Sequence, residues 1–383
     1  MSARNTPDIV DSDDAIVLTG FTIGITADRR WEEQAGHFER RGATVQHGAS
    51  IRTLPLGCDQ RLRTATEQVI AQPPAALIAN TGVGIRSWFS AAETWSLADA
   101  LTAALRDTRI YARGPKAASA IQLHGLEVFA RAKSERLTEA VDLARRDLRP
   151  GDAVVLQLDG SGPSEQTSRL RTAGASVVEV PVYVWTKPDD DGPAVRLAEN
   201  VIAGKVHAVT FTAGPAIRNW MAMAAERDLD SDLRRALTNG QTVVGCVGPV
   251  CVDAAADEGI ATADIVVPKT WRLGSLVRAV TDRLLERRLA LDVGGARLVI
   301  AGNLVTVGDS SVLLTDSEAQ VLTVLAEQPN LVVAKTDLLR MVWRDETADP
   351  HVVEAAVNRL RRRLTPLGVS ITSVYRRGYS LKL

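Results

Sequence analysis

The feature that most constrains the fold of this 383-residue chain is the alternation of short β-rich runs with amphipathic helical stretches from Phe21 onward. Strands and helices that alternate in this way form parallel sheets covered by helices. Two lobes are predicted, because the strands are more numerous than one sheet usually holds. The predicted strands are Thr22–Thr26, Thr44–His47, Ala75–Ala79, Arg109–Ala112, Ala153–Leu158, Ser176–Val180, Ala208–Thr212, Thr242–Val247 and Asp264–Val267. The helical stretches include Gln34–Arg41, Arg61–Ala71, Leu137–Arg146 and Pro215–Glu226.

An approximate internal sequence repeat supports the prediction of two similar lobes. Residues 76–89, ALIANTGVGIRSWF, resemble residues 208–221, AVTFTAGPAIRNWM, in pattern. Residues 110–126 resemble residues 243–260 in the same way. Each stretch combines a strand, a small-residue turn and a helix. A repeated order across two halves indicates two units of the same construction.

The small-residue turns between strands and helices are candidate anion-binding elements. A helix N-terminus offers free N–H groups and a dipole that both favour carboxylates. The turns Thr81–Gly84, Gly114–Lys116, Thr212–Gly214 and Gly248–Val250 follow predicted strands, where ligands usually bind in such sheets. Any one of them can be a simple connection, but four in matched positions favour a shared cleft. The candidate ligand-binding residues are Arg29, Thr81, Gly82, Val83, Gly84, Arg113, Gly114, Lys116, Thr212, Gly248 and Arg272, with Arg30 and Arg86 ranked lower.

Composition excludes several classes of protein. Hydrophobic residues make up 45% of the chain and charged residues 24%, so ordinary cores are expected. The 3 cysteines and 5 histidines show neither disulfide-framework nor metal spacing, and no dinucleotide or P-loop motif occurs. No cofactor and no metal are therefore expected. The polar N-terminus has no signal-peptide core and no run is long enough for a bilayer, so a cytoplasmic protein without membrane contact is predicted.

The formal net charge of −1 means that any nucleic-acid site must come from local clustering. From Arg359 to Lys382 the charged residues are all basic. Within 349–364, DPHVVEAAVNRLRRRL, apolar residues recur at helical spacing on one face, while small and cationic residues occupy the other. Such a face can approach a duplex, because arginine contacts guanine edges or phosphates.

The body of the chain resembles uroporphyrinogen-III synthase from Gly20 to Arg288. The resemblance is carried by NTGVGIRSWF (80–89), ARGPKAASAIQLHGL (112–126), VPVYVWTKPD (180–189), FTAGPAIRNW (211–220), VGPVCVDAAADEGI (247–260) and TWRLGSLVRAV (270–280). It implies two Rossmann/flavodoxin-like α/β lobes joined by a β hinge. Lobe A is expected at 19–54 and 182–288, lobe B at 55–181, and a mobile segment at 1–18.

The same resemblance implies a substrate and a catalytic residue. The family's substrate is hydroxymethylbilane, a linear tetrapyrrole with many carboxylates. Tyr183 matches the tyrosine proposed to assist departure of the hydroxyl group, and a phenol with a pKa of about 10 can donate a proton at neutral pH. A packed strand aromatic is an equally good interpretation of Tyr183.

The C-terminal part, Gly294–Leu383, resembles the winged-helix effector domain of OmpR/PhoB-type response regulators; the domain boundary is placed at residue 289. The resemblance is carried by residues 313–343, 351–364 and 371–381. It implies a capping box from Thr315 to Glu318, a second helix at Lys335–Val342, a recognition helix at Asp349–Leu364 and a hairpin wing at Ile371–Leu381. The implied DNA-binding residues are Val352, Ala355, Asn358, Arg359, Arg361, Arg362, Arg376 and Arg377. Tyr375 replaces the usual wing arginine, so Arg376 or Arg377 takes the minor-groove role.

Three functions remain open at this point. The first is a DNA-binding transcription regulator whose synthase-like lobes bind a tetrapyrrole or a related anion. The second is an active uroporphyrinogen-III synthase with a regulatory tail, and the third is a protein that does both. The combined architecture resembles actinobacterial regulators of nitrate and nitrite assimilation. Double-stranded DNA is the expected partner, and a homodimer on DNA is left open.

Overall fold

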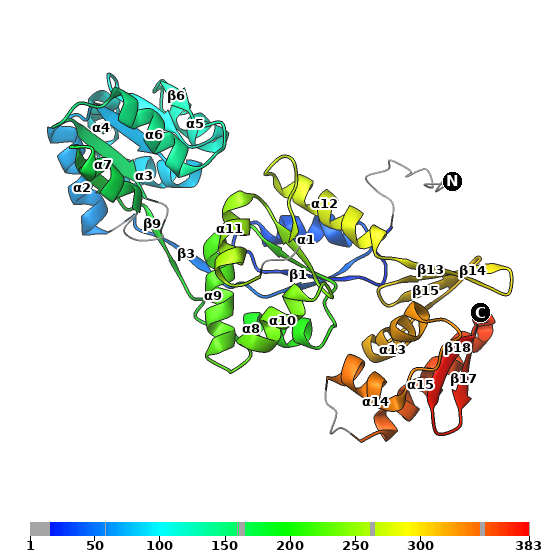
Figure 1. The fold of residues 1–383 in the computed structure, drawn as a ribbon. Coiled ribbons are helices and arrows are strands. Elements are labelled where there is room, and N and C mark those ends of the chain that lie inside the picture. Colours follow the sequence, from blue (N-terminus) through cyan, green and yellow to red (C-terminus); the bar gives the residue numbers. More distant parts are fainter. Residues whose placement is uncertain are drawn as a thin grey trace. The chain divides into compact units, whose positions relative to one another are not determined.

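The computed structural model describes residues 16–382 apart from 58, 159, 161–164, 261–264 and 345–348. The chain divides into two compact units (Figure 1). Unit 1 comprises Met1–Ile51 and Pro188–Leu383, and unit 2 comprises Arg52–Lys187. Most of the predicted mobile segment and the first residue of the predicted strand Asp264–Val267 lie outside the described residues.

Unit 2 is built on a five-stranded parallel sheet with the order β6-β5-β4-β7-β8. Its central strand β4 is buried along its whole length, as expected for a parallel strand covered on both faces. The strands are β4 (Ala76–Ala79), β5 (Arg109–Ala112), β6 (Ala130–Arg131), β7 (Ala153–Gln157) and β8 (Ser176–Val180). The helices are α2 (Gln60–Ala71), α3 (Gly82–Thr94), α4 (Ala98–Leu105), α5 (Pro115–Gln122), α6 (Leu137–Asp147) and α7 (Glu165–Thr172).

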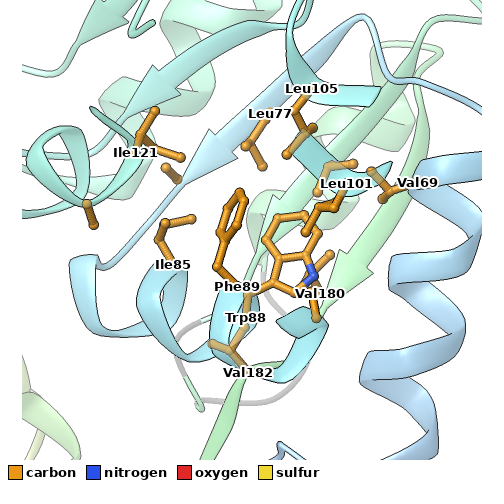
Figure 2. Close-up of a cluster of buried hydrophobic side chains, with 14 of the residues drawn as sticks. Val69, Leu77, Ile85, Trp88, Phe89, Leu101, Leu105, Ile121, Val180 and Val182 are labelled. Atoms are coloured by element: carbon orange, nitrogen blue, oxygen red, sulfur yellow. The ribbon is translucent and has the colours of Figure 1, made fainter. Parts of the chain in front are cut away.

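The core of unit 2 centres on Trp88 and Phe89 of α3, which lie among aliphatic side chains from the sheet and from α2 and α4 (Figure 2). Nε1 of Trp88 donates to Oγ1 of Thr66 at 2.9 Å, so the one polar atom of this buried side chain has a partner. Burial of side chains of this size stabilises a fold by roughly 2–3 kcal/mol each. Helix α3 is therefore held firmly against β4, and its N-terminus is fixed at the end of that strand.

A two-stranded antiparallel ribbon lies where the chain enters and leaves unit 2. Strand β3 (Arg52–Pro55) pairs with β9 (Tyr183–Thr186), and Pro55 is opposite Tyr183. Within the predicted hinge-like stretch 180–189, Tyr183–Thr186 thus form a strand of this ribbon, whereas Val180 ends β8. The lobe boundaries at 55 and 181 remain predictions, although the chain crosses between units close to them.

Unit 1 contains a second five-stranded parallel sheet, with the order β12-β11-β10-β1-β2. Two such sheets in one chain confirm the predicted α/β fold class. The strands are β1 (Thr22–Ile25), β2 (Thr44–His47), β10 (Ala208–Phe211), β11 (Val243–Cys246) and β12 (Ile265–Val266). The helices are α1 (Trp31–Glu39), α8 (Gly192–Ile202), α9 (Gly214–Ala225), α10 (Asp230–Thr238), α11 (Pro249–Asp257) and α12 (Leu273–Glu286).

The remainder of unit 1 is the C-terminal domain, a winged helix preceded by a four-stranded antiparallel sheet. Its strands are β13 (Leu289–Val293), β14 (Ala296–Ala301), β15 (Leu304–Val307), β16 (Ser310–Leu313), β17 (Ser370–Val374) and β18 (Gly378–Lys382). Its helical elements are α13 (Asp316–Glu327), α14 (Lys335–Leu338), the π-helical turn η1 (Leu339–Trp343), α15 (His351–Leu364) and the 3-10 turn η2 (Thr365–Leu367).

Three features of the C-terminal domain differ from the sequence expectations. The sheet β13–β16 was not predicted, and the helix expected at Lys335–Val342 is α-helical only as far as Leu338. One wider turn follows and ends at Arg344, whose φ is 56°. The recognition helix begins at His351, two residues later than expected, because the Asp349 carboxylate accepts a hydrogen bond from the His351 amide at 2.9 Å.

Candidate anion-binding turns and nucleic-acid interface

The turn between β4 and α3 is a rigid helix N-terminus. Thr81 is the N-cap of α3, and its hydroxyl accepts a hydrogen bond from the Gly84 amide at 3.0 Å. The Thr81 amide in turn donates to Oε1 of the buried Gln157 at 2.7 Å. The amides of Gly82 and Val83 have no acceptor within the helix, as in any first turn. Two donors therefore remain for an anion at the carboxyl end of β4.

Glycine is required in this turn because other groups approach its backbone. A Cβ on Gly82 would lie 2.2 Å from the carbonyl oxygen of Lys116, in the first turn of α5. A Cβ on Gly84 would lie 2.3 Å from Nε2 of Gln157. The predicted turns at Thr81–Gly84 and Gly114–Lys116 are thus packed together at one edge of the unit 2 sheet.

A buried polar network supports the same edge. Nη1 of Arg113 donates to Oδ1 of Asn80 at 3.0 Å, and Nε of Arg113 donates to the carbonyl of Glu135 at 2.8 Å. Asn80 is only 3% exposed, and its Nδ2 has no partner among the described residues. The sequence reasoning did not single out Asn80, Gln157 or Glu135. Asn80 and Gln157 could have been found in the sequence, because each is a polar residue at the end of an apolar strand.

Tyr183 lies at this edge too. Its hydroxyl is 3.3 Å from Oγ1 of Thr81, and the side chain is 5% exposed. Its ring passes close to Gly160, where a Cβ would lie 2.9 Å from two ring carbons. A cavity of about 320 Å³ opens beside it and is lined by Arg61, Leu158, Gly160, Glu179, Pro181, Tyr183 and Val184. The structure therefore brings the predicted catalytic tyrosine next to the capped turn of α3.

The unit 1 sheet carries a corresponding set of turns at its carboxyl edge. Arg29, Thr212 and Gly248 follow β1, β10 and β11, which are neighbours in that sheet. A Cβ on Gly248 would lie 3.2 Å from Cγ of Trp271, the residue before Arg272. Arg29, Thr212, Gly248 and Arg272 thus all lie near the carboxyl edge of the unit 1 sheet.

The cationic candidates differ in how firmly they are held. Arg113 is half-buried and bonded, whereas the side chains of Arg29, Lys116 and Arg272 are exposed. Arg86 is also exposed, and Arg30 forms an ion pair with Glu33 at 2.6 Å. Exposed cations reach a polyanion by reorienting, so they supply attraction more than geometry.

The recognition helix α15 has a buried stripe and an outward face. Its buried side chains are Val353, Ala356, Val357, Leu360 and Leu364. Ala355, Asn358, Arg359 and Arg362 are exposed. Arg362 and Ala355 lie almost opposite the buried stripe at 100° per residue. His351 shares their face and was not predicted, although its side chain is 81% exposed.

Three predicted contact residues on α15 are engaged within the domain. Nε of Arg361 donates to the Ile371 carbonyl at 2.8 Å, so this side chain lies between the helix and the wing instead of on the outward face. Nε of Arg359 lies 3.6 Å from Oε1 of Glu318, although the side chain remains 48% exposed. Val352 is half-buried against the core. Arg361 and Val352 lie on the flanks of the core stripe, which explains the difference.

The wing presents further cations. Arg376 and Arg377 are exposed at the turn between β17 and β18, and Tyr375 beside them is 82% exposed. The guanidinium of Arg376 lies 5.2 Å from the centroid of the Tyr375 ring. The cationic patch of the C-terminal domain therefore extends from α15 into the wing.

Neither a membrane-spanning helix nor a metal-binding cluster occurs among the described residues. None of the helices there combines the length and apolarity that a membrane span needs. No cluster of three or more side chains suited to a metal ion occurs within the same ranges.

Comparisons with known proteins match both parts of the chain. The model of the family uroporphyrinogen-III synthase HemD matches residues 32–278, and the model of the C-terminal domain of transcriptional regulatory proteins matches residues 309–381. A solved mutant uroporphyrinogen III synthase from Thermus thermophilus is 25% identical with a TM-score of 0.57, covering 70% of this chain and 100% of that one.

Two curated relatives each match part of the chain. The YjjA protein of Bacillus subtilis is 25% identical, over 68% of this chain and 94% of its own length. The transcriptional regulatory protein PrrA of Mycobacterium tuberculosis is 30% identical over 114 residues, which are 30% of this chain and 49% of that regulator. With its larger part matched by the synthase model and its C-terminal part by the regulator model, the chain belongs to the uroporphyrinogen-III synthase family and carries an OmpR/PhoB-type DNA-binding domain.

Proposed function

We propose that the protein is a transcription regulator whose synthase-family lobes bind an anionic tetrapyrrole, and that this ligand changes its affinity for DNA. The observation that carries the proposal is the union of two surfaces in one chain. One is the outward face of α15, with Asn358 and Arg362 exposed. The other is the set of glycine-containing turns that follow the parallel strands, of which the turn capped by Thr81 is the best defined.

In this proposal α15 contacts the bases in the major groove, and the wing contacts the DNA backbone and so positions the domain. Asn358 can form paired hydrogen bonds with adenine, and Arg362 can contact guanine or phosphate. Arg376 and Arg377 supply positive charge beside the helix, which favours phosphate contacts or the minor groove. A homodimer that places two such helices on successive half-sites is part of the proposal.

The ligand side rests on the chemistry of the turns. Free first-turn amides on α3 and the cations Arg113 and Lys116 suit carboxylates, which are the dominant charged groups of family substrates. A polyanion of that class contacts several turns at once. A role in nitrate or nitrite assimilation is consistent with a tetrapyrrole ligand and belongs to the same proposal.

The test measures binding of the full chain to DNA with and without ligand. A duplex is selected from a random-sequence pool by the protein, and its dissociation constant is measured at fixed salt, in the absence of oxygen, with and without uroporphyrinogen III. We expect a change of about fivefold or more. An unchanged constant at saturating ligand contradicts the regulatory part of the proposal, and no measurable ligand binding contradicts the ligand part.

Lys116→Ala and Arg106→Ala form a matched pair for that titration. Lys116 lies in the first turn of α5, whereas Arg106 is an exposed cation at the end of α4, on the amino side of β5. Lys116→Ala should weaken uroporphyrinogen III binding roughly two- to fivefold, because it removes one exposed charge contact. Arg106→Ala should leave that binding unchanged.

A second candidate function is cyclisation of hydroxymethylbilane to uroporphyrinogen III. It is favoured by one observation, the Tyr183 hydroxyl 3.3 Å from the Thr81 cap and next to a cavity. In this proposal Tyr183 donates a proton to the departing hydroxyl group, while the turn amides hold the carboxylates.

The enzymatic candidate is tested with freshly prepared hydroxymethylbilane and the full chain. The type III to type I product ratio is measured for the wild type and for Tyr183→Phe. A ratio above the spontaneous one, which falls in Tyr183→Phe, supports the activity and the role of the phenol. Type I product alone from the wild type rejects the activity.

A further inference from the structure

Three neighbouring strands of the unit 1 sheet connect two different surfaces. At their carboxyl ends β1, β10 and β11 are followed by Arg29, Thr212 and Gly248. At their amino ends the same strands are preceded by residues that contact the C-terminal domain. Each strand is four residues long, so the two surfaces are about 13 Å apart along the strands.

The first contact joins two backbones. The amide of Asn303, at the turn between β14 and β15, donates to the carbonyl of Gly20 at 2.8 Å, just before β1. A Cβ on Gly20 would lie 2.4 Å from the Leu304 amide nitrogen, and one on Gly302 would lie 2.4 Å from the Gly20 carbonyl oxygen. Both glycines also have positive φ. The close approach therefore depends on glycine on each side.

His207 and Gln241 provide contacts at the other two strands. Nδ1 of His207, which precedes β10, accepts a hydrogen bond from the Thr22 amide at 2.9 Å, and its ring lies next to Gly302. Gln241, just before β11, accepts a hydrogen bond from the guanidinium of Arg344. Arg344 ends η1 and is the last described residue before the segment that leads to α15.

Helix α13 connects this surface with the recognition helix. Nε2 of Gln320 donates to the carbonyls of Ala203 and Gly204, at the end of α8, at 3.1 Å each. Two residues earlier on α13, the buried Glu318 pairs with Arg363 of α15 at 3.2 Å. A shift of α13 relative to the sheet is therefore transmitted to the orientation of α15.

The interface between the sheet and the C-terminal domain combines polar and apolar contacts and is only partly filled. It leaves a cavity of about 940 Å³ whose walls come from both sides, including Asp232, Arg235, Gln320 and Arg344. A mixed and incompletely filled interface within a chain permits relative motion of the two parts, whereas a large, densely packed apolar one does not. Strands β10 and β11 are buried along their whole length, so we expect them to behave as rigid connections.

We infer that the amino edge of the unit 1 sheet is a docking surface for the DNA-binding domain, and that β1, β10 and β11 couple occupancy of the carboxyl-edge turns to the position of α13 and α15. The inference deepens the proposed function by locating its coupling. By linkage, DNA bound at α15 must also change the behaviour of the Thr212 and Gly248 turns.

That reciprocity permits a test that needs no tetrapyrrole. Hydrogen exchange of the segments around Thr212 and Gly248 is measured in the full chain, with and without a saturating duplex selected by the protein. We expect DNA to change their exchange rates by about fivefold or more in the wild type. In Gln320→Ala/Arg344→Ala the change should fall below about twofold, because the hydrogen bonds of α13 to the end of α8 and of Arg344 to Gln241 are gone.

The matched control is Gln328→Ala/Arg297→Ala, which makes the same two substitutions at exposed positions of α13's C-cap and of β14. It should retain the DNA-dependent change. Gln320→Glu is a second docking variant, because a carboxylate facing two carbonyl oxygens cannot donate to them. A wild type without DNA-dependent exchange at both turns, or docking variants that retain it, overturns the inference. Failure of uroporphyrinogen III to bind rejects the proposed ligand alone.

Discussion

Nε of Arg363 in the recognition helix lies 3.2 Å from Oε2 of Glu318, a side chain of α13 with no exposed surface. The same Oε2 accepts a hydrogen bond from the Thr315 amide at 3.0 Å, which completes the capping box of α13. The buried carboxylate of Glu318 thus caps the N-terminus of α13 and also pairs with a side chain of α15. The two helices of the DNA-binding domain are joined electrostatically as well as by their shared core.

Removal of that carboxylate should destabilise the C-terminal domain. Glu318→Ala deletes the reciprocal cap and the partner of Arg363, and we expect a loss of about 1–3 kcal/mol in the free energy of unfolding. The effect is measured as a shift of the urea denaturation midpoint, provided that the dependence of the free energy of unfolding on urea concentration is unchanged. Glu327→Ala, at the exposed end of the same helix, should cost less than about 0.5 kcal/mol. Equal midpoints for both variants would show that the buried pair contributes nothing.

Arg362 is expected to contact DNA because it lies opposite the buried stripe of α15. Arg362→Ala should weaken binding to a selected duplex by about 1–3 kcal/mol if the side chain reads a base. A phosphate contact would instead lower the salt slope by about 1 and weaken all sequences alike. Arg106→Ala in unit 2 serves as the charge control. Unchanged affinity and salt slope in Arg362→Ala would remove this residue from the interface.

The base-reading role predicted for Arg359 and the groove or phosphate role predicted for Arg361 can be separated by the same titration. Arg361→Ala should lower stability more than DNA affinity, because its guanidinium bonds to Ile371 and to Ser373 at 2.8 Å each. Arg359→Ala should weaken binding by about 1–3 kcal/mol if the side chain leaves Glu318 to reach a base. Melting temperature and dissociation constant are measured for both variants.

Gly82→Ala should disrupt the capped turn of unit 2. The new Cβ would lie 2.2 Å from the Lys116 carbonyl oxygen, which belongs to backbone and cannot rotate away. We expect a cost of about 1–3 kcal/mol and weaker binding of uroporphyrinogen III. Gly57→Ala is the control, because nothing lies within 4 Å of the added carbon. A Gly82→Ala protein as stable as this control would contradict the close packing of α3 and α5.

His207 should make stability depend on pH. Burial lowers its pKa from 6.5 to about 4, against the opposing effect of Asp316. The folded state therefore favours the neutral ring, and the unfolded chain binds the extra proton as pH falls below about 6.5. From pH 7.5 to pH 5 this residue should lower the free energy of unfolding by about 2 kcal/mol.

His207→Asn is the matched variant for that measurement, since its amide oxygen can accept the Thr22 hydrogen bond without titrating. Urea midpoints at the two pH values, compared between wild type and variant, isolate the contribution of His207 from that of other histidines. The variant should lose about 2 kcal/mol of the pH difference. An identical pH dependence in both proteins would show that the ring does not titrate in this range.

Much of the fold could be predicted because apolar strands and their turns are local patterns. Ala76–Ala79 and Ala208–Phe211 are uniformly buried runs followed by Thr and Gly, which identifies parallel strands and their helix starts. The capping box at Thr315 was equally local. Strands β13 to β16 were missed, since Leu289–Val293 alternates between half-buried and exposed residues and adjoins a domain boundary. The π-helical turn changes the spacing of buried residues over a single turn, which is too short to be recognised from hydrophobic periodicity in the sequence.

Prediction of the candidate sites was less complete for a physical reason. Thr81, Gly82 and Arg113 lie in motifs whose chemistry is visible in the sequence. Asn80, Gln157 and Glu318 act through partners far away in the chain. Gln320 and Arg344 are polar surface residues by composition, and only the fold shows that they bridge two domains.

The paired glycines Gly20 and Gly302 limit how this architecture could have been assembled or can be re-engineered. A winged helix taken from another regulator needs a glycine at the β14–β15 turn, and a synthase body taken from another enzyme needs one before β1, or the two backbones collide. Chimeras made by exchanging whole domains should therefore fail unless both glycines are present at the new junction.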